Sequence, residues 1–391
     1  MAIDKKVLNV PHMRFPEFTE EWNSKSLIDL ANVIGGGTPD TTVKSYWDGE
    51  IQWFTPSEIG KSKYVDLSIR TITEEGLNNS SAKLLPSGTI LLSTRATIGE
   101  CSLSLRKCAT NQGFQSLVSK KCNTDFLYYL IQTKKKDLIR KSCGSTFLEI
   151  SANEVRKIQV SVPTEVEQQR IAELLSLIDE RIATQNKIIE DLKKLKSAII
   201  EMEYGHVTKS ISYIGDFIEQ TSKRNKDSAI QNVLSVSNSQ GFIQQSEQFE
   251  NRIVASDDTS NYKIVERNDF AFNPARINVG SIARLTTFER GIVSPMYICF
   301  HTKDNLYPEY LDYYFESKHF FTEIQKRLEG SVRQCLSFDG LCNIPLWVPT
   351  IEKQQQIGNR LSALVQETKL EIDFLELLQK QKQYLLRQMF I

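Results

Sequence analysis

The sequence predicts an α+β fold: two tandem mixed α/β domains separated by two long helices that pair as an antiparallel coiled coil, with a pseudo-two-fold relation between the halves. The first observation is a repeated phrase, VPTEVEQQRIAELLS at Val162 and VPTIEKQQQIGNRLS at Val348, almost half a chain length apart. The second is an apolar stripe with heptad-like spacing, which begins within each copy of this phrase. The third is that strand-like and helix-like segments do not alternate regularly ahead of the stripes, which favours α+β over a doubly wound sheet.

The repeat extends beyond this phrase and sets the expected domain boundaries. The spacing from Val162 to Val348, which we call the repeat offset, holds without a gap through both stripes. Earlier in each half, after small shifts in the offset, GTILLSTRATIG matches DFAFNPARINVG, which aligns Arg95 with Arg276. We therefore expect a first globular domain, a central helix, a second globular domain and a C-terminal helix, at 1–163, 164–205, 206–349 and 350–391.

The stripes predict two long helices that need each other. Positions seven residues apart carry Ile171, Ile178, Gln185, Leu192 and Ile199, and the second copy continues the pattern with Ile357, Leu361, Leu364, Leu375, Leu378 and Leu385. Forty helical residues form a rod of roughly 60 Å. A rod of this length cannot bury its stripe on one small domain, so the other helix is its natural partner.

Short apolar runs predict the strands of the globular domains. In the first domain we expect strands at TILLS, FQSLV and KIQVSV, and a helix near 124–141. In the second we expect strands at VSPMYICFH and NIPLWV, and a helix near 309–328. Both domains are therefore predicted to be mixed α/β.

Composition indicates a soluble cytoplasmic protein without a global attraction to nucleic acid. Its 48 basic and 48 acidic residues cancel, so any basic patch must be local. No apolar run approaches the length of a membrane span, so no membrane partner is expected. The seven cysteines include no CxxC pair and the four histidines are scattered, which suits a reducing compartment and argues against zinc.

Signatures of catalysis and cofactor binding are missing. The GGG at Gly35 is followed by Thr38 and a proline rather than by a helix start, so it is not a dinucleotide or phosphate loop. FNPAR at Phe272 lacks the second proline and the aromatic residue of an amino-methyltransferase motif. We therefore expect a non-catalytic chain with no metal and no cofactor of its own.

Several motifs, in order and duplicated, identify a family. MRFPEFTEEW begins at Met13, GGGTPDT and YWDGEIQWFTPSEI lie between Gly35 and Ile59, and ATNQGFQSL begins at Ala109. Together with the two VP-to-QQ phrases and their helices, they resemble the specificity subunit of type I restriction–modification enzymes. The second half departs from this pattern, with QTSKRNKDS in place of the glycine loop and SPMY in place of NQGF. It should therefore belong to a different recognition class and read different bases.

The resemblance implies a non-catalytic reader of double-stranded DNA. Each globular domain would be a target-recognition domain for one half of a bipartite, asymmetric site. The helices would act as a spacer and as a dock for two methyltransferase subunits and, in the full enzyme, for motor-nuclease restriction subunits. S-adenosylmethionine, ATP and Mg are expected on those partner subunits and not on this chain.

Polar and basic loop residues are the candidates for DNA contact, because base edges and phosphates are read by such side chains. In the first domain the candidates are Thr38, Ser45, Tyr46, Trp47, Lys61, Lys63 and Arg95. In the second they are Lys223, Arg224, Asn225, Asn238, Ser239, Gln240, Arg276 and Arg333. The alternative for each is a solvated surface residue or a loop anchor.

Two other functions compete with DNA recognition. A coiled-coil adaptor that joins proteins without touching DNA would fit the zero net charge. An autonomous methyltransferase is disfavoured by the missing cofactor and catalytic motifs.

Overall fold

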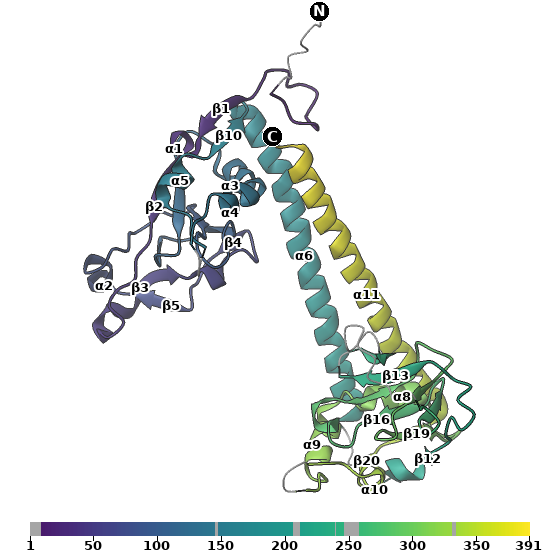
Figure 1. Ribbon diagram of the computed structural model, residues 1–391. Coiled ribbons are helices and arrows are strands. Elements are labelled where there is room, and N and C mark those ends of the chain that lie inside the picture. The colour runs from purple at the N-terminus through teal and green to yellow at the C-terminus, as the bar shows by residue number, and fades with distance from the viewer. Residues whose placement is uncertain (1–8, 145–147, 206–211, 239, 246–257, 331–333) are drawn as a thin grey trace, which may run out of the picture. The chain divides into compact units, whose positions relative to one another are not determined.

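The computed structural model describes residues 9–144, 148–205, 212–238, 240–245, 258–330 and 334–391 (Figure 1). The chain divides into two compact units: unit 1 comprises Met1–Asn186 with Asp373–Ile391, and unit 2 comprises Lys187–Ile372. Each unit thus contains one globular domain, the start of the long helix that follows that domain, and the end of the long helix of the other repeat.

Unit 1 is a mixed α/β domain. Its strands are β1 (Asn23–Ser26), β2 (Ala31–Gly35), β3 (Trp47–Phe54), β4 (Tyr64–Val65), β5 (Arg70–Ile72), β6 (Ile90–Leu92), β7 (Cys101–Ser104), β8 (Cys108–Thr110), β9 (Gln115–Ser119) and β10 (Gln159–Val162). Its short helices are α1 (Leu27–Leu30), α2 (Glu74–Asn78), α3 (Thr124–Thr133), α4 (Lys135–Arg140) and α5 (Ala152–Arg156). Among the described residues the sheets run β2-β9-β6-β7-β4, β5-β3-β8 and β1-β10.

Unit 2 repeats this plan. Its strands are β11 (Ser212–Tyr213), β12 (Ile218–Thr221), β13 (Val233–Ser237), β14 (Gly241–Gln244), β15 (Lys263–Glu266), β16 (Phe270–Phe272), β17 (Ile282–Arg284), β18 (Arg290–Val293), β19 (Ile298–Thr302) and β20 (Pro345–Leu346). Its short helices are α8 (Pro308–Tyr314), α9 (Lys318–Gln325) and α10 (Phe338–Cys342). In the part of unit 2 that is described, the sheets run β12-β19-β16-β17, β14-β13-β18-β15 and β11-β20. The order β12-β19-β16-β17 matches β2-β9-β6-β7, and both second sheets contain a parallel pair, β3 with β8 and β13 with β18.

The long helices α6 (Glu165–Tyr204) and α11 (Ile351–Gln388) pair within each unit. In unit 1 the start of α6 lies beside the end of α11 (Figure 1). It shares a core with Leu386 and Met389. In unit 2 the end of α6, at Ile200, shares a core with Ile357 and Leu361 at the start of α11. Because the beginning of one helix meets the end of the other in both units, the pairing is antiparallel, as the stripes predict.

The structure corrects both helices predicted in the globular domains. The segment near 124–141 forms two helices, α3 and α4, rather than one. The segment near 309–328 forms two helices, α8 and α9, rather than one. The hydroxyl of Ser317 accepts a hydrogen bond from the amide of Phe320 at 3.2 Å and caps α9, so a new helix starts there. The strand predicted at VSPMYICFH is also shorter than expected, since β19 begins only at Ile298.

Candidate nucleic-acid interface

Three loops of unit 1 emerge at one end of its five-stranded sheet. Strand β2 ends at Gly35 opposite Gln115, where β9 begins. Strand β6 ends at Leu92 opposite Cys101, where β7 begins. In antiparallel neighbours the end of one strand lies beside the start of the next. The loops after β2, after β6 and before β9 therefore meet here, and we call this place the loop end of unit 1.

Hydrogen bonds join these loops. The amide of Thr94, after β6, donates to the carbonyl of Gly113, before β9, at 2.8 Å. The hydroxyl of Thr38, after β2, donates to the side-chain oxygen of Gln112 at 2.5 Å. A side chain at Gly36 would place its Cβ 2.0 Å from a backbone oxygen of the neighbouring loop, so only glycine fits there. The glycine-rich stretch thus brings these loops together.

Arg95 stands on the loop between β6 and β7 at this end. Its guanidinium lies 2.7 Å from the carboxylate of Glu149, and the two side chains are 44% and 39% exposed. The next residue, Ala96, has φ of 56°, a left-handed conformation that is unfavourable for a residue with a side chain. The predicted arginine is therefore partly exposed, but a carboxylate is already bound to it.

The corresponding end of unit 2 carries different residues. Strand β12 ends at Thr221 opposite Cys299 of β19, as β2 ends opposite β9. Lys223 and Arg224 therefore follow β12 where the glycine loop follows β2, and both are exposed. Arg276 is exposed on the loop between β16 and β17. Among the described residues, no carboxylate lies within ion-pair distance of Arg276.

The turn between β13 and β14 lies beside the Arg276 loop. Asn238 and Gln240 are exposed in this turn. A Cβ at Gly280, four residues after Arg276, would lie 3.8 Å from the backbone oxygen of Asn238. Arg276, Asn238 and Gln240 are thus brought together, and with Lys223 and Arg224 they form what we call the loop end of unit 2.

Lys63 differs from the expectation of a free cation. Its side chain is only 7% exposed and lies 2.6 Å from the carboxylate of Asp125. It also donates a hydrogen bond to the hydroxyl of Ser176 on α6 at 2.7 Å. Lys63 therefore fastens the domain to the long helix.

Three further candidates are engaged inside their own domains. Trp47 is 7% exposed. Its ring packs edge-on against that of Trp53, with the ring centres 5.2 Å apart, and the guanidinium carbon of Arg70 lies 3.5 Å from the centre of the Trp47 ring. Tyr46 packs half-buried against the same cluster. Asn225 is fully buried, and its amide both accepts from and donates to the backbone of Ile230. These side chains shape the second sheet of unit 1 and the loop after β12.

The remaining candidates fall in three places. Ser45 is exposed, and its carbonyl accepts from the hydroxyl of Thr73 at 2.8 Å. Lys61 is exposed at the mouth of a cavity between the first domain and the helices. Ser239 and Arg333 lie outside the described residues.

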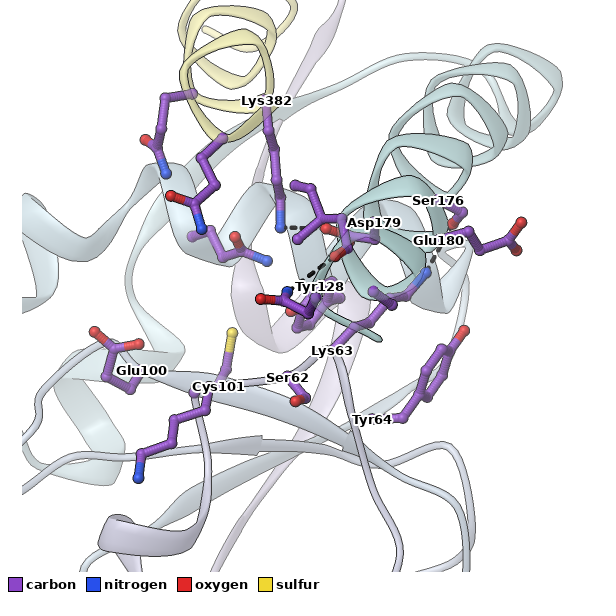
Figure 2. A pocket seen from close by; sticks show the side chains of 18 of the residues that line it. Ser62, Lys63, Tyr64, Glu100, Cys101, Tyr128, Ser176, Asp179, Glu180 and Lys382 are labelled. Carbon is purple, nitrogen blue, oxygen red and sulfur yellow. Dashed lines mark hydrogen bonds and ion pairs between the residues drawn. The ribbon is translucent and has the colours of Figure 1, made fainter. Parts of the chain in front are cut away.

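The cavity beside Lys61 marks a joint that the sequence analysis missed. It encloses about 1110 Å³ between the domain, the start of α6 and the end of α11, all in unit 1 (Figure 2). Asp179 of α6 accepts a hydrogen bond from the Tyr129 hydroxyl at 2.7 Å and pairs with Lys382 of α11 at 2.6 Å. Burial raises the pKa of Tyr129, and the nearby Asp179 raises it further, so the phenol stays protonated and remains a donor. The joint binds both helices to the domain.

Unit 2 builds a similar joint, in which a tyrosine, a serine and a lysine recur but the carboxylate belongs to the domain rather than to a long helix. The Tyr313 hydroxyl lies 3.0 Å from that of Ser362, just as Tyr129 contacts Ser176, and the repeat offset relates the two serines. Lys196 lies 5.3 Å from the ring of Tyr313 and pairs with Glu316 at 2.7 Å. The repeat offset also relates Lys196 to Lys382. The shared offset of these serines and lysines is the signal in the sequence that would have located both joints.

Comparison with known proteins identifies the first half of the chain. Residues 19–194 match the family model of the type I restriction modification DNA specificity domain. These residues belong to that family. The match covers the loop end of unit 1, the part of the joint contributed by the domain and α6, and most of α6. The resemblance to specificity subunits of type I restriction–modification enzymes is thus confirmed.

Individual relatives agree with this assignment. The MjaIX specificity subunit of Methanocaldococcus jannaschii is 37% identical over 181 residues, which cover 45% of this chain and 42% of the relative. The EcoR124I/EcoR124II specificity subunit of Escherichia coli is 30% identical over 190 residues, which cover 46% of each chain. Each alignment spans less than half of the relative's length.

Solved structures resemble the fold over nearly the whole chain. The S subunit of a type I restriction–modification system from M. genitalium superposes with a TM-score of 0.58 at 15% identity, covering 98% of this chain and 99% of that chain. A chain from a structure of type I R-M complex assembly gives the same TM-score and identity, covering 95% and 97%. The predicted α+β fold with two long helices is thereby confirmed.

Proposed function

We propose that this chain is the DNA sequence-recognition subunit of a type I restriction–modification system, in which each globular domain reads one half of a bipartite, asymmetric site. The observation that carries the proposal is the pair of loop ends. Two sheets of matching strand order present loops at the same end, yet those loops differ in sequence: GGGT and NQG in unit 1, SKRN and SPMY in unit 2. A common scaffold with different loops is what two half-sites of different sequence require.

Local charge at the loop ends supports contact with DNA even though the chain has no net charge. Lys223, Arg224 and Arg276 are exposed in unit 2, and Arg95 is partly exposed in unit 1. Amides and hydroxyls accompany them, in Thr38 and in the turn after β13. Arginine and lysine bind phosphate and guanine, while amides and hydroxyls read base edges.

The proposal extends to partners and location. Two methyltransferase subunits would dock on the long helices, and restriction motor-nuclease subunits would complete the enzyme. S-adenosylmethionine, ATP and Mg would bind those subunits, while this chain contributes no catalytic group. In the described part of the chain, no three His, Cys, Asp or Glu side chains are grouped to hold a metal ion. We propose the cytoplasm as its location. None of the described helices has the length and apolar character to cross a membrane.

The test is a salt-dependent mobility-shift assay of the full chain together with its methyltransferase subunits. Phosphate contacts release counterions, so affinity should fall linearly on a log–log plot against salt concentration. Arg276→Gln should reduce the slope by about one. Lys107→Gln, which removes an exposed charge after β7 at the opposite end of the unit 1 sheet from the loops, is the control and should leave the slope unchanged.

The adaptor alternative makes the opposite prediction. A coiled-coil adaptor would assemble with partner proteins but would not shift DNA in this assay. Absence of a salt-dependent shift in the assembled complex would therefore reject the DNA-reading proposal.

A further inference from the structure

The ion pair between Arg95 and Glu149 has a fixed geometry. Glu149 forms an antiparallel backbone pair with Cys143, in which its amide and carbonyl exchange hydrogen bonds with those of Cys143 at 3.0 and 2.9 Å. On the other side, the amide of Ile150 donates to the carbonyl of Thr94 at 3.2 Å, and Arg95 forms a backbone bridge to Glu149. The backbone therefore holds the carboxylate next to the arginine from both sides.

Unit 2 has the same antiparallel backbone pair without the carboxylate. Glu329 and Cys335 exchange backbone hydrogen bonds at 2.9 and 2.8 Å, and the repeat offset relates them to Cys143 and Glu149. The amide of Leu336 donates to the carbonyl of Pro274 at 3.0 Å, as Ile150 does in unit 1. Cys335 thus takes the place of Glu149. The backbone pair does not require an acid at this position, so the carboxylate in unit 1 needs another reason.

We propose that Glu149 tunes DNA binding by the first domain, because it occupies the guanidinium of Arg95 until a DNA phosphate or base displaces it. This inference rests on the proposed DNA-reading function. A carboxylate and a phosphate compete for the same fork of N–H donors. Once displaced, Glu149 is left beside a polyanion, which opposes binding. This competition and repulsion lower the affinity for non-cognate DNA, which gains few other contacts. At a cognate site, base contacts offset the loss of affinity.

The size of the effect follows from exposure. An ion pair as exposed as this one changes the equilibrium constant of a competing interaction by at most about fivefold. Glu149→Gln should therefore tighten binding to a scrambled double-stranded DNA by roughly two- to fivefold. Glutamine keeps the shape and one acceptor oxygen of the glutamate, so the backbone pair with Cys143 should be retained.

The matched control is Asp66→Asn. Asp66 pairs with Arg106 at 2.5 Å, with side chains 43% and 60% exposed, so this substitution also frees one arginine and removes one negative charge. If Glu149 acts through Arg95, Glu149→Gln should tighten binding clearly more than Asp66→Asn does. Its effect should also shrink when Arg95→Gln is added, because only the direct repulsion between Glu149 and DNA then remains.

The experiment compares the wild-type chain and these variants, each with its methyltransferase subunits, on the same scrambled DNA at one salt concentration. Equal tightening by Glu149→Gln and Asp66→Asn would overturn the inference in favour of a general charge effect. An undiminished effect in the double variant would overturn the role of Arg95. If the wild-type complex bound no DNA at all, the proposed function itself would fail, which distinguishes the two claims.

Discussion

At the scale of single residues, one glutamine explains why the same phrase opens both long helices. The side chain of Gln168 accepts from the amide of Asn123 at 2.9 Å and donates to the carbonyl of the proline before α6 at 3.0 Å. Gln354 accepts from the amide of Tyr307 at 2.7 Å and donates to the equivalent proline carbonyl at 2.9 Å. Both side chains are buried. Each one links the start of a long helix to the start of a short helix of its domain, α3 or α8.

We predict that Gln354→Leu lowers the free energy of unfolding of unit 2. Leucine fills the space but leaves the amide of Tyr307 without its partner in a buried position, at a cost of about 1–3 kcal/mol. Faster amide hydrogen exchange in α8 would measure the loss. Gln355→Leu, on the adjacent exposed position, is the control and should stay within about 0.5 kcal/mol of wild type. Equal exchange in both variants would show that the buried amide does not anchor the helix.

Single residues also mark the limit of what the sequence could predict at the site. Arg95, Thr38 and Arg276 were placed at loop ends by residue type and by the repeat, and the structure puts them there. Lys63 and Asn225 are likewise a basic and a polar residue, but their side chains are buried and bond to other groups of their own units. Partners such as Asp125 and Ser176 lie far away in sequence, so composition and spacing could not separate these residues from the exposed ones.

At the scale of elements, each globular domain is completed by the helix of the other repeat. In unit 1, the ring centre of Phe390 lies 5.3 Å from that of Phe126 and 6.3 Å from that of Trp22. In unit 2, the ring centre of Tyr204 lies 4.9 Å from that of Tyr310. The repeat offset relates Tyr204 to Phe390, so they are the same position of the repeat. The apolar stripes predicted that the helices pair, but not that their last turns enter the partner repeat's core.

We predict that Phe390→Ala destabilises unit 1 and leaves unit 2 unchanged, although residue 390 is nearly at the end of the chain. Phe390 is 6% exposed, and the loss of a buried phenylalanine costs about 3–5 kcal/mol. Hydrogen exchange should accelerate in α3 but not in α8. Tyr384→Ala, 54% exposed on the same helix, is the control and should change neither. Faster exchange confined to unit 2 would contradict the reciprocal packing.

At the scale of the whole molecule, the fold was largely predictable because it repeats. The constant repeat offset and the two stripes were sufficient to predict two domains and two long helices. The internal order of the sheets was not predictable, since β3 and β8 are parallel neighbours although four other strands lie between them in the chain. Such long-range pairing leaves no periodic trace in the sequence.

The most direct test of the two-reader account exchanges the reading part of one domain. Strands β1 and β10 pair with Ser26 opposite Gln159, so residues 27–158 begin and end side by side and form a natural module. This module would be replaced by the corresponding segment of a relative with another specificity, chosen to retain the residues that face α6 and α11.

The measurement is the methylated motif, read by methylation-aware sequencing of DNA from a host that carries the chimaera and its methyltransferase subunits. The account predicts that one half of the bipartite motif changes, while the other half and the gap between them stay the same. A motif that changes in both halves, or in neither, would contradict the claim that each globular domain reads its own half-site.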